Sequence, residues 1–366
     1  MTTSMHSQRG VALLTILLLV VSITVVAGAM LASQKIAIRR SGLLFNQNQL
    51  LQDIDAAKQL AVTIINADSM LNDSDSLQDI WAQPIAPYPL GSHSVTMKIR
   101  DEAGRFNINN LYHDGAPDSA ALAVFQRLLI QLNLEPDIAI AALDWQDSDS
   151  EVYNDGGDEG AVYGQQGASV NTLNTSLPNQ PFVSIDQLQQ VRGMSAEALA
   201  SLRPFITAVP YYLPLNINTA SPEILAALVD GVSAQQAQAL VTLRQQQVIE
   251  SIDSIWEQPP LNAISAEQRQ LLAPLLAVDS RAFTAVITAT DSGNLGEARQ
   301  RFATVLIAKT DAADSSKANN NTAANGNSSN AVNNNNNNNN ADNKDDKAAK
   351  TISVVSQRLW AFPPNF

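Results

Sequence analysis

The chain has 366 residues, 45% of them hydrophobic, which is enough to bury one large core or two smaller ones. The formal net charge of -13 opposes binding to nucleic-acid phosphates, because such binding depends on Lys and Arg side chains replacing counterions. The absence of cysteine excludes disulfides, thiolate metal sites and a cysteine nucleophile.

The first predicted element is a membrane-spanning helix. Residues 11–32 carry no charged side chain and are rich in Leu, Val, Ile and Ala. At about 1.5 Å per residue such a segment reaches roughly 30 Å, the thickness of the hydrocarbon core of a bilayer. A buried core helix is the alternative, but an apolar run of this length so near the N-terminus is uncommon in a soluble core. We therefore expect a single membrane span.

Three processing outcomes fit this N-terminus. Small residues at 27–29 could form a signal-peptidase site and leave Met30 as the first residue of a secreted protein. The segment could also stay as an uncleaved anchor. In the third outcome, residues 1–10 form a short polar leader, since Arg9 and Gly10 stand directly before the apolar run without a spacer.

That third arrangement resembles the prepilin family, whose leader ends in Gly and is cut by a prepilin peptidase that then methylates the new N-terminus. The resemblance implies cleavage between Gly10 and Val11. Pilins usually carry Glu as the fifth mature residue, whereas this chain has Thr15 there. Such a glutamate is thought to pair with the terminal amine of a neighbouring subunit. The K-type minor pseudopilins of type II secretion systems also lack it, which is consistent with a subunit at the tip of the pseudopilus.

The membrane helix is expected to continue through residues 33–70. An apolar stripe at helical spacing predicts that this part packs on a domain, and it consists of Leu50, Ile54, Ala57, Ala61 and Ile64. A continuous N-terminal helix of this kind is the spine of the pilin fold.

Strand-like sequence stands on both sides of a long helical region. Val95, Met97 and Ile99 alternate with polar residues, and the polar turn at 101–104 leads to Phe106, which predicts a β-hairpin. Strands return only near the C-terminus, in segments 283–290, 302–307 and 352–360.

The order of these elements predicts an α+β fold, in which an N-terminal transmembrane and spine helix packs on a small antiparallel sheet. Residues 71–113 and 280–366 supply the two parts of the sheet domain, and residues 114–279 form a large inserted α-helical domain. K-type pseudopilins resemble this chain in having such an insertion. The asparagine-rich segment 314–350 is expected to be a disordered loop.

Serine N-caps recur through the predicted helical domain. They indicate an internal helical repeat, and they are Ser184, Ser195, Ser221, Ser233, Ser251 and Ser265. Residues 216–232 resemble a helix-hairpin-helix module, so a DNA-binding membrane protein of the DNA-uptake type is the second candidate function. Residues 182–278 hold four arginines, no lysine and eight acidic residues, however, which opposes DNA binding.

Seven carboxylates crowd one glycine-containing segment: Asp144, Asp147, Asp149, Glu151, Asp155, Asp158 and Glu159. Hard oxygen donors on a flexible loop suit Ca²⁺, although a solvated acidic loop explains the same composition. The spacing does not match an EF-hand.

K-type pseudopilins commonly carry an Asp-Trp-x-Asp-x-Asp stretch followed by Gly-x-Glu and bind calcium there. Residues 144–149 and 157–159 match that pattern. The resemblance therefore implies a structural Ca²⁺ with Asp147, Asp149 and Glu159 as ligands, and with Asp158 and Asp144 as further candidates. Asp144 could instead cap or orient the loop.

No catalytic constellation is evident, and the chain is predicted not to be an enzyme. His6, His93 and His113 are isolated in the sequence, and a hydrolase that uses the acidic cluster is a third hypothesis.

The resemblance implies a minor pseudopilin that caps the tip of the pseudopilus and helps initiate its assembly, for export of folded proteins across the outer membrane. The expected partners are the I-, J- and H-type minor pseudopilins, the prepilin peptidase and inner-membrane lipid, with no nucleic acid. The expected location is the inner membrane of a Gram-negative bacterium, with most of the chain in the periplasm.

Overall fold

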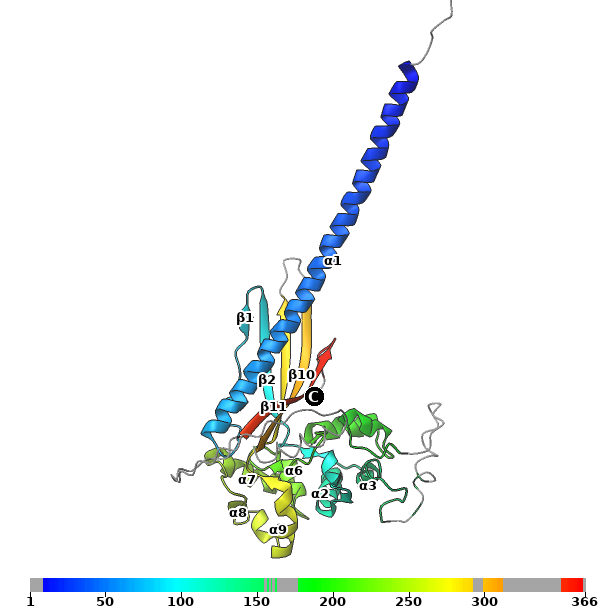
Figure 1. Cartoon of the computed structure of the whole chain (residues 1–366). Helices are drawn as coiled ribbons and strands as arrows, with labels where there is room; N and C mark the ends of the chain where they lie inside the picture. Colours follow the sequence, from blue (N-terminus) through cyan, green and yellow to red (C-terminus); the bar gives the residue numbers. More distant parts are fainter. Residues whose placement is uncertain are drawn as a thin grey trace, which may run out of the picture.

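The computed structural model describes residues 9–154, 157, 159, 162, 177–291, 299–311 and 350–364. Its longest element is α1 (Arg9–Leu71), a helix of 63 residues that projects far beyond the rest of the protein (Figure 1). At a rise of 1.5 Å per residue α1 is about 95 Å long. Its first part is apolar and exposed, and α1 is long enough to cross a membrane.

The second part of α1 packs on the sheet through a buried stripe, which consists of Leu50, Ile54, Ala57, Ala61 and Ile65. Four of these five residues match the predicted stripe. The fifth differs, because Ile64 is only half-buried and Ile65 takes the buried position. A step of four residues from Ala61 keeps Ile65 on the face of the earlier members, which are also spaced by three or four.

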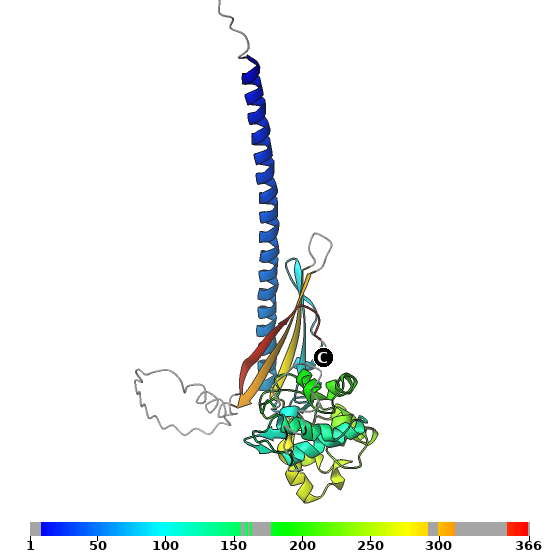
Figure 2. The same cartoon turned by 90° about the vertical axis from the view of Figure 1, so that its right-hand side faces the viewer.

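A five-stranded antiparallel sheet lies against α1 (Figure 2). Its order is β1-β2-β9-β10-β11. The strands are β1 (Tyr88–Leu90), β2 (His93–Asp101), β9 (Ala282–Asp291), β10 (Arg299–Asp311) and β11 (Lys350–Trp360). The predicted late strands are therefore confirmed, and β9 pairs with β2 across the whole inserted domain.

The predicted hairpin is wrong, although its first strand is right. Val95, Met97 and Ile99 face the buried side of β2, as the alternation indicates, but β2 forms its hairpin with β1 around Gly91 at φ +65. Phe106 belongs instead to β3 (Phe106–Asn107), which pairs in parallel with β6 (Ile206–Thr207). An alternating pattern identifies a strand but not its partner.

Asp101 explains why the chain does not return along β2. Its carboxylate accepts hydrogen bonds from the Ala103 N–H at 2.7 Å and from the hydroxyls of Thr219 at 2.5 Å and Ser280 at 2.7 Å. These contacts fix the turn at the end of β2 against the inserted domain. The chain therefore enters that domain near residue 103 and not at the predicted boundary of residue 114, because Phe106, Ile108 and Leu111 already belong to its core.

The inserted domain is mainly helical, as predicted. Its α-helices are α2 (Ser119–Gln131), α3 (Asp137–Asp144), α5 (Ala196–Leu202), α6 (Pro222–Ala227), α7 (Ala234–Gln246), α8 (Ile252–Ile255) and α9 (Ala266–Leu272). Short 3-10 turns and two-residue strands join them; the strands are β4 (Tyr112–His113), β5 (Ala116–Pro117), β7 (Leu215–Asn216) and β8 (Leu276–Ala277). One continuous apolar core lies among these elements.

The predicted serine caps are all present. Each of the six hydroxyls accepts a hydrogen bond from a backbone N–H of the following turn, which satisfies a donor that the helix itself leaves open. Ser233 with Gln236 and Ser265 with Gln268 form complete capping boxes. The asparagine-rich loop predicted at 314–350 lies outside the described residues, apart from Lys350, which begins β11.

Three buried asparagines connect the start of the inserted domain to distant segments, a role that no sequence pattern predicted. The Asn107 amide donates to the Tyr211 carbonyl at 2.8 Å, and the Asn110 amide donates to the Leu213 carbonyl at 2.7 Å. Asn109 exchanges hydrogen bonds with the backbone of Phe182. Backbone groups that would otherwise be buried without partners are satisfied in this way.

Candidate functional site

The predicted acidic cluster forms a compact group of three carboxylates. Asp144 is the last residue of α3, Asp147 lies in the turn that follows, and Glu159 returns to them from the far side of the loop. One carboxylate oxygen from each residue lies within 4.8 Å of the others. Such a spacing would allow all three to contact a single cation.

Packing and backbone contacts hold this loop in place. The Trp145 ring stacks on Phe182 with centroids 5.4 Å apart, and the Gln146 amide donates to the Ile108 carbonyl at 3.1 Å. The Glu159 N–H donates to the Ser150 carbonyl at 3.1 Å, which brings the end of the loop back to its start.

The three carboxylates are almost entirely buried. Asp144 is 0% exposed, Asp147 3% and Glu159 4%. Burial, together with the neighbouring carboxylates Asp149 and Asp144, raises the pKa of Asp147 to about 7. Burial and the same group of acids raise the pKa of Glu159 to about 7. Without a cation the cluster therefore resists ionisation at neutral pH.

Two oxygens of the cluster indicate room for a ligand. Oδ1 of Asp147 and Oε1 of Glu159 are buried and have no hydrogen-bond partner within the described part of the chain. Buried carboxylate oxygens without partners are costly unless a cation or a donor satisfies them. Because the donor set consists of hard oxygens, it fits Ca²⁺ better than a softer transition metal.

The remaining candidate ligands occupy different places. Asp144 shares the cluster and also accepts the Tyr153 N–H at 3.1 Å, so it orients the loop as well. Asp149 is exposed, lies outside the group of three, and accepts the Glu151 N–H at 2.8 Å. Asp158 lies outside the described residues.

A second carboxylate group, which the sequence analysis missed, lies where α1 ends. Asp68, Asp75 and Asp79 also place one oxygen each within 4.8 Å of the others. The density of aspartates after residue 67 was the available signal. Lys309 forms a buried ion pair with Asp75, so part of this negative charge is already neutralised.

His93 is isolated in the sequence but not in the fold. Its ring lies between two buried carboxylates, with Nδ1 2.8 Å from Asp53 on α1 and Nε2 3.7 Å from Asp291 on β9. The ring therefore links the spine helix to the sheet.

At the membrane end, the Thr15 hydroxyl donates to the Ala12 carbonyl at 2.9 Å, within α1 itself. The position that carries Glu in most pilins is therefore occupied here by a neutral group that is satisfied inside its own helix. Gly10 and Val11 lie in the first turns of α1, and their side chains are outside the described residues.

Three of the four arginines in residues 182–278, all of them described by the structure, bond to other groups of the chain, and the fourth, Arg192, is exposed outside the helix-hairpin-helix segment. Arg244 is buried and donates to the Ile217 carbonyl at 2.5 Å, Arg269 donates to the Ile264 carbonyl at 3.1 Å, and Arg203 pairs with Asp186. These guanidinium groups are therefore used within the chain and not offered to phosphates.

Comparison with known proteins decides among these possibilities. Two family models, both described as type II secretion system (T2SS), protein K, match residues 104–211 and 215–279. The chain belongs to the protein K family. Members of this family are structural pseudopilin components, and the comparisons give no support to the DNA-uptake alternative.

Relatives in the protein K family align with most of this chain. A type II secretion system protein K from Pseudomonas aeruginosa is 29% identical over 264 residues, covering 68% of this chain and 76% of the relative. One from Aeromonas hydrophila is 29% identical over 327 residues, covering 83% of this chain and 94% of the relative.

A solved structure supports the fold of this protein K chain. A chain of the GspK-GspI-GspJ complex from enterotoxigenic Escherichia coli matches with a TM-score of 0.64 at 20% identity, covering 88% of this chain and 99% of that chain. The predicted α+β fold is therefore confirmed.

Proposed function

We propose that this protein K chain caps the tip of a type II secretion pseudopilus and helps initiate its assembly, for export of folded proteins across the outer membrane. The main observation in support of this proposal is the position of the inserted domain. The inserted domain lies at the end of the sheet opposite to the projecting part of α1 (Figure 2). A subunit of this shape has no room for an identical copy above it in a tightly packed filament.

Thr15 supports the same position. A subunit inside a filament benefits from a carboxylate that neutralises the terminal amine of its neighbour in the membrane. Thr15 offers a neutral hydroxyl that is already bonded to Ala12. A tip subunit does not need to neutralise the amine of a subunit above it.

The proposed partners are the I- and J-type minor pseudopilins, with the H-type below them. The structural relative was solved in a complex whose name includes GspI and GspJ. The part of α1 outside the membrane also keeps exposed leucines beside its buried stripe, among them Leu51 at 36% and Leu60 at 37%. These side chains suit helix-to-helix packing with such partners.

Processing and location belong to the same proposal. A prepilin peptidase would cut between Gly10 and Val11 and methylate the new N-terminus. Residues 11–32 would then anchor the chain in inner-membrane lipid, with the sheet and the inserted domain in the periplasm. Mass spectrometry of the mature N-terminus tests this step, since N-methylated Val11 supports it and Met30 contradicts it.

Calcium completes the proposal as a structural cofactor. Asp147 and Glu159, with their unpartnered buried oxygens, would hold the ion, and Asp144 would contribute while it orients the loop. Asp149 and Asp158 stay candidate ligands by resemblance. Bound Ca²⁺ would supply positive charge that neutralises the buried carboxylates and so fixes the loop after α3.

Reconstitution tests the tip assignment. The full chain in detergent micelles should stay unassembled alone and should form a defined complex when I- and J-type pseudopilins are added, as measured by multi-angle light scattering. Leu60→Asp should weaken this complex at least tenfold, whereas Gln59→Asp, on the exposed face of the same helix, should not. Filaments formed by the chain alone would contradict a tip position.

A further inference from the structure

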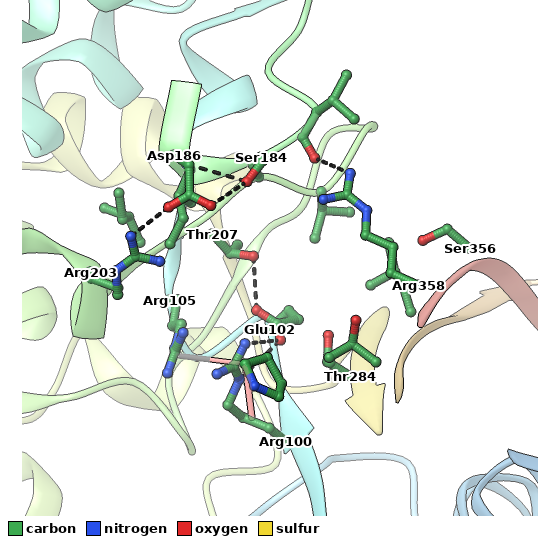
Figure 3. Close-up of a pocket in the computed structure, with 18 of the residues that line it drawn as sticks. Arg100, Glu102, Arg105, Ser184, Asp186, Arg203, Thr207, Thr284, Ser356 and Arg358 are labelled. Carbon is green, nitrogen blue, oxygen red and sulfur yellow. Dashed lines mark hydrogen bonds and ion pairs between the residues drawn. The ribbon is translucent and has the colours of Figure 1, made fainter. Parts of the chain in front are cut away.

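The described residues enclose a cavity that the proposed function does not use. It has a volume of about 340 Å³ and lies between the sheet face that α1 leaves open and the edge of the inserted domain (Figure 3). Side chains from β2, β9, β10 and β11 form one wall, and the segments at 183–186 and 206–209 form the other. The cavity is lined by residues that are far apart in the sequence, so no local sequence motif predicts it.

Arginine dominates the charge of this cavity. Four arginines and two acidic residues line it, namely Arg100, Arg105, Arg203, Arg358, Glu102 and Asp186. The lining therefore carries two more positive than negative charges (4 - 2), in a protein whose net charge is -13. In so acidic a chain, arginines without carboxylate partners are unexpected unless another anion neutralises them.

Both acidic side chains already have hydrogen-bond partners within the chain. Glu102 accepts hydrogen bonds from Arg100 Nε at 3.0 Å and Nη2 at 2.6 Å, and its other oxygen accepts the Thr207 hydroxyl at 2.8 Å. Asp186 accepts Arg203 Nη2 at 2.5 Å. Arg100 and Arg203 are therefore neutralised within the chain.

Arg105 is left without an acceptor. Its side chain is half-buried, and it forms no hydrogen bond or ion pair with any residue that the structure describes. Burial and the nearby charge of Arg100 lower the pKa of Arg105 to about 10, against the opposing effect of the Glu102 and Asp101 carboxylates, so the group stays charged at neutral pH. A partly desolvated guanidinium with unused donors is costly unless a ligand accepts from it.

Arg358 supplies a second cation at the open side of the cavity. It is exposed, and it donates to the Val183 carbonyl at 3.1 Å, a neutral acceptor that leaves its charge uncompensated. The hydroxyls of Ser184 and Ser356 line the same space. Arg100 and Thr207 show how this wall binds a carboxylate, because they hold Glu102 by two guanidinium donors and one hydroxyl.

We propose that this cavity is a binding site for a carboxylate ligand, which pairs with Arg105 inside and with Arg358 at the opening. Two carboxylates would balance the excess charge of the lining, so a dicarboxylic acid or a peptide segment with adjacent acidic side chains fits best. A phosphate would concentrate both charges on one group beside the buried carboxylate of Glu102, whereas two separate carboxylates place one charge at each arginine.

Isothermal titration calorimetry of the full chain in detergent micelles at low ionic strength tests the site, with three probes: succinate, a blocked diglutamyl peptide and inorganic phosphate. Succinate or the peptide should bind, and Arg105→Gln should weaken that binding at least tenfold. Arg358→Gln should weaken it about threefold. Arg192→Gln removes an exposed arginine of the inserted domain outside the cavity and should leave the affinity unchanged.

The probes also distinguish the source of the carboxylate. A peptide that binds at least ten times more tightly than succinate indicates a protein segment, whereas equal affinities indicate a free dicarboxylate. Arg105→Lys keeps the charge and controls for folding, and it should retain part of the affinity. Tighter binding of phosphate than of both carboxylates, or binding that survives both Arg105→Gln and Arg358→Gln, would overturn the proposal.

Discussion

Lys309 on β10 donates a hydrogen bond to Asp75, in the segment that follows α1, and both side chains are only 2% exposed. The same Asp75 oxygen accepts the Ser280 N–H at 2.7 Å, at the point where the chain leaves the inserted domain. One buried ion pair therefore joins the end of the spine helix, the sheet and the end of the inserted domain.

Removing the cation of this pair should be strongly destabilising. Lys309→Met leaves Asp75 buried without its counterion, and we expect a loss of about 3–5 kcal/mol in the free energy of unfolding. Lys350→Met is the matched control, because Lys350 is 3.8 Å from Asp279 and both side chains are partly exposed. Its cost should stay below about 1 kcal/mol. Urea denaturation measures both, and equal losses would contradict a special role for Lys309.

Stability should fall as the pH rises through neutrality. Burial raises the pKa of Asp101 to about 7 in the folded state, above its value of about 3.9 in an unfolded chain. The folded state therefore holds a proton that the unfolded state releases. This contribution is complete below about pH 4 and is lost as the pH passes 7, at a cost of about 4 kcal/mol.

Asp68, whose pKa burial raises to about 6, acts in the same direction, and so do Asp147 and Glu159 when no cation is bound. Urea denaturation at pH 5 and pH 8 in the presence of EDTA measures the slope, and Asp101→Asn should reduce it. A slope that is unchanged in Asp101→Asn would show that another group is responsible.

Calcium should stabilise the chain through Asp147 and Glu159. A ligand at a hundred times its Kd adds about 2.7 kcal/mol to the free energy of unfolding, if it binds only the native state. Asp147→Asn and Glu159→Gln should abolish the rise in Tm that calcium produces, and Asp149→Asn should reduce it less. Asp137→Asn, an exposed change in the first turn of α3, should keep the full rise. If the Tm of the unmutated chain does not change when calcium is added, the proposal that this site binds calcium is wrong.

The serine caps should contribute individually. Ser265→Ala removes the hydroxyl that caps α9 and its capping box with Gln268, and it should cost about 1 kcal/mol. Ser201→Ala, on the exposed side of α5, should be neutral or slightly stabilising, because Ala is the better helix former. Thermal unfolding of both variants makes the comparison, and a larger loss from Ser201→Ala would contradict it.

Local patterns in this chain predicted local structure well. The apolar stripe of α1, the late strands and the serine caps depend on spacing or on a single turn of backbone, and these are properties that a sequence displays directly. The acidic loop was found for a similar reason, since Asp144 and Asp147 are close in the sequence.

Contacts between distant segments escaped prediction. Asp53, His93 and Asp291 come together only because α1, β2 and β9 pack on one another, and no spacing rule connects them. The partner of β2 was wrong for the same reason, since period-2 alternation is satisfied equally by either neighbour. Arg105 is an unremarkable residue in the sequence, and only the fold shows that Glu102 is already taken by Arg100.

The pairing of Asp101 with Phe283 places the entrance and the exit of the inserted domain side by side. If that domain were still unfolded, pairing β2 with β9 would close a very long flexible loop, at an entropic cost of about 4–5 kcal/mol. A folded insertion brings its own two ends together and removes this cost in advance. We therefore expect the helical domain to form first during folding, with the sheet and its hold on α1 following as a later step.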